Sequence, residues 1–273
     1  MLCADDFGVS PGVSQAIARL AGSERLGAAS CITTGRHWRA QAPRLRDLPA
    51  SVQIGLHFNL SEGQPLSPDL ARTWPQFPAL PRLIALAHLG LGLGLLPRSA
   101  LAAEFTAQWD AFVLATGHAP HYVDGHQHVH HLPGVRELLL AAVPPALPMR
   151  NTGHVLGPAF AVKRWLIERT GGTALQRALA QRGTPHNTAL LGVYDFQASD
   201  YRRLMQHWLA RLPAEGGLLF CHPGDAGGAD GDAADPIAAA RLREAAYLGS
   251  AAFADDLAAA HVRLGAAWHR LND

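Results

Sequence analysis

The chain has 273 residues, of which 48% are hydrophobic and 16% charged, and its formal net charge at pH 7 is +1. This composition is ample for one hydrophobic core, and α/β barrels of this size are commonly single domains, so we expect one domain over residues 1–273. A net charge near zero without a run of Lys and Arg argues against a nucleic-acid-binding surface.

Apolar runs alternate along the chain with segments of helical spacing. In chain order, we expect a short strand over 2–4, a helix over 11–20 capped by Ser10, strands over 28–33 and 52–56, a helix over 101–116, a strand over 122–123, a helix over 134–143, a strand over 217–221 and a helix over 237–248. This alternation predicts a parallel sheet with right-handed crossovers and with its chemistry at the C-terminal strand ends. We therefore expect a single-domain α/β fold, a (β/α) barrel that is irregular or incomplete because its first strand is so short.

Segment 80–96 is the part of the sequence that comes nearest to a membrane span. It is strongly apolar but is interrupted by Pro81, Arg82, His88 and three glycines. A spanning helix needs about 20 predominantly apolar residues, so we expect no integral membrane segment. The segment is predicted to form a helix or lid beside the active site, with contact to a membrane surface as the alternative.

The three cysteines, Cys3, Cys31 and Cys221, lie in or beside apolar runs and have no Cys-x-x-Cys spacing. They are expected to be small buried hydrophobic residues. Cys221 precedes His222, which would suit a nucleophilic thiol, but neighbouring residues of a strand point to opposite faces. An odd number of cysteines and the lack of a signal peptide pattern at the start predict a cytoplasmic location.

Acidic and histidine residues gather at three of the expected strand ends. Asp5 and Asp6 follow the first strand, His57 follows the third, and residues 124–131 (DGHQHVHH) follow the fourth. One carboxylate and two imidazoles leave positions open for water and substrate, which is typical of a catalytic metal site, and they suit Zn²⁺ or another first-row ion better than Ca²⁺. The other aspartate would accept a proton from the water. The alternative is a set of unrelated capping acids and hydrogen-bonded histidines.

Four groups of residues are similar, in their order and spacing, to those of a known family. They are residues 4–10 (ADDFGVS), 55–66 (GLHFNLSEGQPL), 122–130 (YVDGHQHVH), and 221–224 (CHPG) with 241–244 (RLRE) and 248–250 (LGS). With these groups the chain resembles the YdjC-like carbohydrate deacetylases, which include chitooligosaccharide deacetylases and hopanoid-associated relatives. One such match is weak, but the four together are specific.

The resemblance implies a role for each residue of the cluster. Asp6, His57 and His126 would hold one divalent metal ion, Zn²⁺ or Mg²⁺, and Asp5 would be the general base. His222, after the apolar run 217–221, would be the general acid. The implied reaction is metal-dependent hydrolysis of the N-acetyl group of a sugar or oligosaccharide, which gives acetate and an amino sugar.

Four further residues are candidates for substrate contact or for support of the metal ligands: Asn59, Asp124, His128 and Arg150. Asp124 would orient an imidazole, as carboxylates beside metal-bound histidines do. Alternate residues of an extended segment share one face, so His128 is the next candidate for metal contact after His126. Trp38 and Trp74 would offer apolar faces to a sugar ring, unless they belong to the core.

Two other functions stay open at this point. A non-catalytic glycan-binding protein on the same scaffold would be expected to lack the base or a metal ligand, and this chain retains them all. A two-metal phosphoesterase would need more carboxylates, and a phosphate site would favour Lys, Arg or a Gly-rich turn. The Gly- and Asp-rich residues 224–232 do not follow a calcium-loop pattern and are expected to form a flexible loop. The expected partner is an N-acetylated sugar; a lipid attached to it and a homodimer are left open.

Overall fold

The structure is a computed structural model that describes residues 1–93, 95–226 and 235–269. Its centre is a sheet of parallel strands in the order β4-β3-β2-β1-β6-β5. The strands are β1 (Leu2–Phe7), β2 (Ala28–Cys31), β3 (Gln53–Phe58), β4 (Val123–Gly125), β5 (Ala189–Leu191) and β6 (Gly217–Cys221). This parallel order requires a crossover after each strand, and helices occupy those crossovers.

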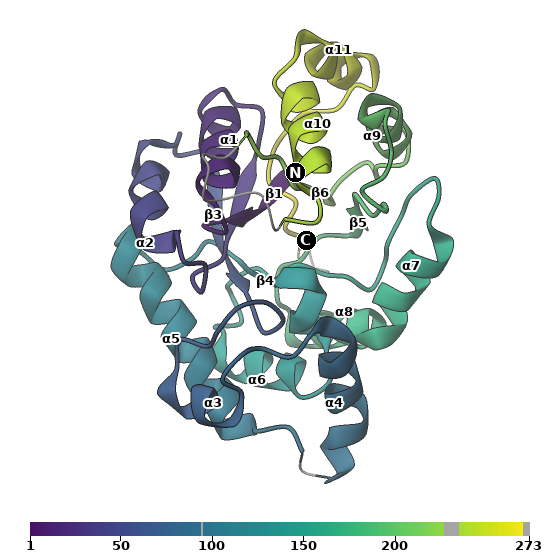
Figure 1. Ribbon diagram of the computed structural model, residues 1–273. Helices are drawn as coiled ribbons and strands as arrows, with labels where there is room; N and C mark the ends of the chain where they lie inside the picture. Colours follow the sequence, from purple (N-terminus) through teal and green to yellow (C-terminus); the bar gives the residue numbers. More distant parts are fainter. Residues whose placement is uncertain (94, 227–234, 270–273) are drawn as a thin grey trace.

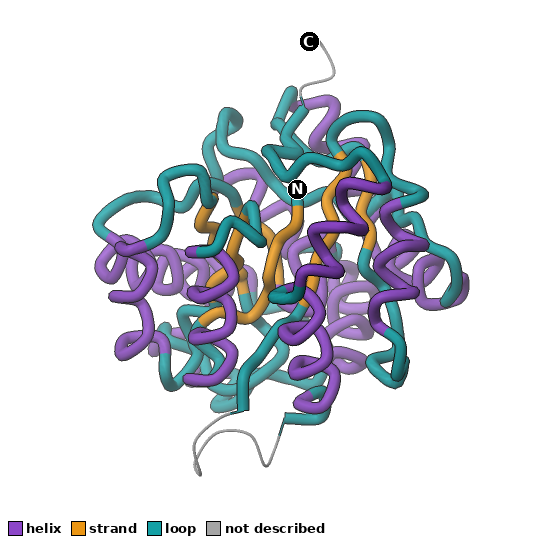
Figure 2. Tube along the Cα trace, turned by 90° about the horizontal axis from the view of Figure 1, so that it is seen from above, coloured by secondary structure: helices purple, strands orange, loops and turns teal. Residues whose placement is uncertain are grey.

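Helices surround the sheet, as Figures 1 and 2 show. The α-helices are α1 (Pro11–Gly22), α2 (Trp38–Gln41), α3 (Pro68–Thr73), α4 (Leu80–Leu93), α5 (Arg98–Thr116), α6 (Val135–Ala142), α7 (Ala161–Ile167), α8 (Thr173–Arg182), α9 (Tyr201–Leu209), α10 (Ala238–Leu248) and α11 (Ala251–Ala259). Two 3-10 segments, η1 (Ala42–Asp47) and η2 (His126–His131), and one π-helical turn, η3 (Glu168–Gly172), complete the described elements.

Residues 148–156, which we call the closing segment, pair with both edge strands of the sheet. Met149 forms an isolated parallel bridge with Val123 of β4, and Val155 forms one with Leu190 of β5. The Arg150 amide also donates to the Val123 carbonyl at 3.1 Å. The strands thus follow a barrel whose remaining arc is irregular chain, and the expected irregular or incomplete (β/α) barrel is confirmed.

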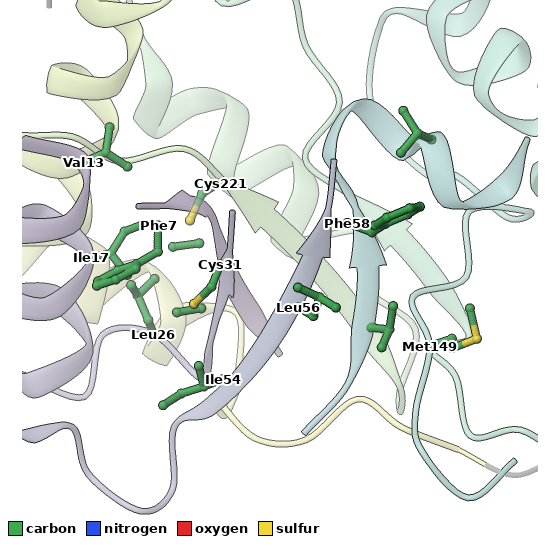
Figure 3. Packing of buried hydrophobic residues seen from close by; sticks show 14 of the residues in the cluster. Phe7, Val13, Ile17, Leu26, Cys31, Ile54, Leu56, Phe58, Met149 and Cys221 are labelled. Atoms are coloured by element: carbon green, nitrogen blue, oxygen red, sulfur yellow. The ribbon is translucent and has the colours of Figure 1, made fainter. Parts of the chain in front are cut away.

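The main core lies between the sheet and the helices that cover it. All six residues of β1 are buried, as expected of a parallel strand with neighbours on both sides. Phe7 of β1 and Ile17 of α1 belong to the same apolar cluster (Figure 3). The Ser10 hydroxyl accepts the Val13 amide at 3.2 Å, so the predicted cap of α1 is confirmed.

The element boundaries differ from the sequence predictions where polar residues stand inside a strand. The first strand continues through the two aspartates to Phe7, and the third runs to Phe58 rather than ending before His57. Charged and imidazole side chains are uncommon in buried strands, so the apolar pattern ends before the strand does at both places.

Helix α4 (Leu80–Leu93) makes up most of the apolar segment 80–96. Its residues Leu80 and Ile84 line the cavity described below. The expectation of a helix beside the site is therefore confirmed over the part that the structure describes, while residue 94 lies outside it. None of the described helices is long and apolar enough to cross a bilayer.

Candidate active site

A cavity of about 450 Å³ opens where the C-terminal ends of the strands meet. Asp5, Asp6, His57, His126 and His222 all line it, although they come from four different strands or their ends. The sequence therefore predicted a group of side chains that the fold does bring together. This position agrees with the general rule that parallel α/β sheets carry their sites at these ends.

A backbone irregularity lets two consecutive aspartates face the same cavity. The pairing of β1 with β2 changes register between Ala4 and Phe7, and Asp6 has a φ of 75°. Few residues other than glycine adopt the left-handed region, and Asp is among those that do so most readily. In a regular strand Asp5 and Asp6 would point to opposite faces, but here they are only 3% and 2% exposed beside one site.

Asp6, His57 and His126 form a compact cluster of ligand-type side chains. Asp6 Oδ1 lies 3.0 Å from His126 Nδ1 and 3.7 Å from His57 Nε2. One ligand atom from each of the three residues lies within 4.8 Å of the other two. All three side chains are buried, and a carboxylate with two imidazoles is a donor set suited to a divalent metal ion.

The hydrogen bonds of the cluster fit a bound cation. His57 Nδ1 lies 2.6 Å from Asp124 Oδ1, and because a carboxylate can only accept, the proton of the neutral ring belongs on Nδ1. His57 Nε2 is then an acceptor that faces Asp6 Oδ1, another acceptor. Asp6 Oδ1 lies 3.0 Å from His126 Nδ1, but within the described part of the chain no group makes a hydrogen bond of regular geometry to it. Two buried acceptors aimed at each other are stabilised by a cation between them.

The pKa shifts of His126 and Asp6 are those of a charged pair. Burial disfavours the charged imidazole, but Asp6 and Glu62 outweigh it and raise the pKa of His126 to about 10. The pKa of Asp6 lies well below its ordinary value, because Arg241 and His126 more than offset its burial. A metal ion would take the place of the His126 proton, so metal binding should release protons.

A buried arginine lies beneath the cavity and joins two of the carboxylates. Arg150 donates from Nη1 and Nη2 to the two oxygens of Asp5, at 2.7 and 2.6 Å, and Nη2 is 2.6 Å from Asp124 Oδ2. Burial raises the pKa of Asp124, but Arg150 and His57 lower it below its ordinary range. Arg150 and Asp124 thus support the residues at the cavity and do not line it, which is one of the two roles predicted for them.

Glu62 is a member of the site to which the sequence assigned no role. Its Oε2 lies 3.3 Å from His126 Nε2, and its Oε1 accepts from Gln127 Nε2 at 2.7 Å. Asn59 shapes this loop, because its Oδ1 accepts the amides of Ser61 and Glu62. Asn59 is buried and does not line the cavity, so it supports the loop and is not placed for substrate contact. The sequence signal for Glu62 was its place in the motif 55–66, which carries the family resemblance but assigned Glu62 no role.

Helix α10 contributes two further residues that the sequence analysis left without a role. Arg241 Nη2 donates to Asp6 Oδ2 at 2.8 Å, and Glu244 Oε2 accepts the His222 amide at 2.6 Å. Residues three apart share one face of a helix, so one turn of α10 holds both a candidate ligand and the candidate acid. The hydroxyl of Tyr194 also donates to Glu244.

His222 lies at the end of β6, where the sequence placed it. Its ring packs against Phe196 and Phe220, with centroid distances of 5.2 and 5.5 Å. Within the described residues, its Nδ1 has no hydrogen-bond partner. Burial lowers the pKa of His222 to about 4, although Asp6 and Asp5 oppose that shift. At neutral pH the imidazole is therefore uncharged.

Glu244→Gln is expected to change how stability depends on pH. Burial raises the pKa of Glu244 from 4.5 to about 7, so between these values the folded chain holds a proton that the unfolded chain has lost. The stabilisation is full below pH 4.5 and is lost as the pH rises through 7. In metal-free protein, the free energy of unfolding of wild type should fall relative to Glu244→Gln by about 1–3 kcal/mol between pH 5 and 7.5.

Denaturant unfolding of both proteins across that pH range measures this difference. Other titrating groups are common to the two proteins and largely cancel. Glu215→Gln, at an exposed position, is the matched control and should follow wild type. Parallel pH profiles for wild type and Glu244→Gln would contradict the assignment.

The histidine cluster after β4 does not have the extended form that the sequence analysis assumed. Gln127 and His128 adopt φ values of 49° and 63° inside η2, so the segment is not extended. His126 and His128 both line the cavity, and His128 packs edge-on against Phe220 at 5.5 Å. His128 lies outside the ligand cluster, and the expectation of an extended segment is wrong. Alternation holds only for extended backbone, which left-handed residues interrupt.

The remaining candidates of the sequence analysis are two tryptophans, one cysteine and the predicted loop. Trp38 is buried and stacks on Phe112, and neither Trp38 nor Trp74 lines the cavity. The aromatic residues that do are Tyr194, Phe196 and Phe220. Cys221 is buried and burial raises the pKa of its thiol, which disfavours a nucleophilic thiolate, as the sequence analysis expected. In the predicted loop, Asp225 pairs with Arg19 at 2.6 Å, and residues 227–232 lie outside the described part of the chain.

Curated proteins are similar to this chain over about half of its length. Chitooligosaccharide deacetylase from Enterobacter sp. (strain 638) is 30% identical over 142 residues, which cover 50% of this chain and 52% of that protein. Carbohydrate deacetylases from Xenopus laevis and Homo sapiens are 34% and 33% identical, and the matches cover 49% and 52% of this chain and 44% of each of those proteins. The matches thus span about half the length of these curated relatives.

The fold is shared with a solved structure. A proposed cellobiose-phosphate cleavage protein from Enterococcus faecalis V583 superposes with a TM-score of 0.70 over 98% of this chain and 96% of that one, at 18% identity. At that identity the likeness concerns the fold alone. The family described as YdjC-like protein matches residues 1–259. The chain therefore belongs to the YdjC-like protein family.

Proposed function

We propose that the protein is a metal-dependent deacetylase that hydrolyses the N-acetyl group of an N-acetylated sugar or oligosaccharide. The observation that carries the proposal is the facing pair of buried acceptors, His57 Nε2 and Asp6 Oδ1, beside a second carboxylate, Asp5, in one cavity. The names of the relatives support the class of reaction and of substrate.

The proposed chemistry divides between a metal and the residues around it. When bound by Asp6, His57 and His126, a divalent ion such as Zn²⁺ or Mg²⁺ supplies a water of lowered pKa and polarises the acetyl carbonyl. Asp5 accepts the proton of the attacking water. Arg150 donates to both Asp5 oxygens, and Cys3 Sγ also donates to Oδ1, so Oδ2 is the oxygen that keeps a second lone pair for that proton.

His222 is proposed to protonate the departing amine. Because its imidazole is uncharged at neutral pH, it must gain a proton before it can donate one. Asp5 and His222 line the same cavity, so the proton taken from water has a short route to the leaving group. An imidazolium of low pKa is a strong acid, which suits protonation of an amide nitrogen.

The cavity suits a sugar better than a phosphorylated group. Its volume of about 450 Å³ is in the range of small-molecule sites, and Tyr194, Phe196 and Phe220 present apolar faces on which a sugar ring can pack. A two-metal phosphoesterase would need a second cation site. Among the described residues, the other carboxylate cluster, Cys3 with Asp5 and Asp124, already surrounds the Arg150 guanidinium.

Acetate release from a panel of N-acetylated mono- and oligosaccharides tests the proposal. Metal-loaded protein should release acetate from at least one member, a chelator should abolish the release, and Zn²⁺ or Mg²⁺ should restore it. Binding of a sugar by metal-loaded protein without acetate release from any member would contradict the proposal and favour a glycan-binding protein.

A further inference from the structure

Exposed apolar side chains are concentrated on two helices beside the cavity. Among the described residues, five of the eight large hydrophobic side chains that are most exposed lie on α4, on α7 or directly after α4. They are Leu89 (69% exposed), Leu95 (56%), Val162 (72%), Trp165 (54%) and Leu166 (47%). No residue of α7 is buried, although the helix contains Val, Trp, Leu and Ile. Such a concentration on one part of a surface is typical of an interaction site.

The two helices belong to one face of the molecule. His88 Nε2 of α4 lies 2.9 Å from the carbonyl of Thr170, in the turn that continues α7. Leu80 and Ile84 of α4 and Leu166 and Ile167 of α7 line the same cavity. Both helices lie on the right side of Figure 1, with α7 above α4. We call the exposed side chains of α4, Leu95 and α7 the α4–α7 face.

The charge of this region differs from that of the rest of the chain. Residues 80–98 and 161–170 contain five Lys and Arg residues and one acidic residue, Glu168. The Lys163 ammonium donates to the Tyr194 carbonyl beside the cavity, and Arg164 Nη1 is buried, so Arg82, Arg98 and Arg169 are the basic residues available at the surface. The whole chain has a formal net charge of only +1. Glu168 Oε1 accepts the Val155 amide, and the Arg169 guanidinium lies over the Trp165 ring at 5.8 Å. Exposed Trp and Leu next to Arg and Lys is the composition of helices that lie in a membrane interface.

We propose that the α4–α7 face docks the protein on the surface of an anionic lipid membrane. The exposed Val162, Trp165 and Leu89 side chains would enter the headgroup region, and Arg82, Arg98 and Arg169 would face the anionic headgroups. A second copy of the chain is the less suitable occupant, because a two-fold contact through this face would bring two groups of basic residues together. The proposal does not depend on the reaction proposed above.

Sedimentation with lipid vesicles tests this proposal on the full chain. Wild type should sediment with vesicles of phosphatidylcholine containing phosphatidylglycerol, much less with phosphatidylcholine alone, and less as salt is added. The double variant V162S/W165S should lower the vesicle affinity about tenfold or more, because the buried apolar area is lost. The double variant R82Q/R169Q should weaken binding only to the anionic vesicles.

Leu114→Ser is the matched control, because Leu114 is 84% exposed on α5 and outside the α4–α7 face. It should bind vesicles as wild type does, and thermal unfolding should show that every variant is folded. Absence of sedimentation with anionic vesicles, or equal binding by wild type and V162S/W165S, would overturn the proposal. So would a dimer, measured by light scattering without lipid, that V162S/W165S converts to a monomer, since it would assign the face to a second copy.

Discussion

Asp5→Asn is expected to keep the metal and to lower kcat by about 10²–10⁴-fold, the usual effect of removing general acid–base assistance. Asp6→Asn is expected to weaken or abolish metal binding, because Asp6 is the only carboxylate of the candidate ligand cluster. Asn keeps the shape and one acceptor oxygen, so the two variants differ in chemistry more than in packing. Metal content and turnover, measured for both variants, separate base from ligand.

The structure shows that Asp5→Asn should also affect stability, which must be measured beside turnover. Asp5 pairs with the fully buried Arg150, which also pairs with Asp124, so Asp5→Asn should reduce the free energy of unfolding by about 1–3 kcal/mol. Turnover must therefore be measured at a temperature where each variant is folded. Loss of metal from Asp5→Asn with retention in Asp6→Asn would reverse the two roles, and normal turnover by Asp5→Asn would contradict the mechanism.

His57→Ala and His126→Ala should each lose metal and activity together. Three protein ligands leave no further residue of the cluster to compensate for a missing one. Elemental analysis of the purified variants, together with acetate release, measures both effects. His154→Ala is the matched control, because His154 is exposed and does not line the cavity. Full metal occupancy in either cluster variant would contradict the ligand assignment.

The positions of the cluster could be predicted from the sequence, because each member stands at or near the end of an apolar run. In a parallel sheet those ends converge, so His57 and His222 could be placed together without coordinates. Glu62 and Glu244 could not, because one lies in a loop and the other on a helix that follows the last strand. Their contacts with His126 and with the His222 amide depend on tertiary packing.

The fold was predictable to a similar extent. Strand β6 is a continuous run without charged or imidazole side chains, and β1 begins with an apolar run, which indicates buried strands. No element was predicted between residues 144 and 216, although this region contains α7, α8, β5 and α9. Strand β5 has only three residues, Ala189–Leu191, and so short a run has no measurable period. The closing segment also has no strand pattern, because it makes isolated bridges and not a ladder.

The closing segment couples the completion of the barrel to the assembly of the candidate active site. Arg150 lies 145 residues after Asp5 in the chain, and its guanidinium reaches Asp5 and Asp124 only when residues 148–156 join β4 to β5. Without that cation, burial of the two carboxylates would be strongly unfavourable. If this arc opens, the Asp5 and Asp124 carboxylates therefore cannot stay buried. Because Asp124 orients His57, that imidazole would lose its orientation as well. Metal capture would then be restricted to molecules that have finished folding.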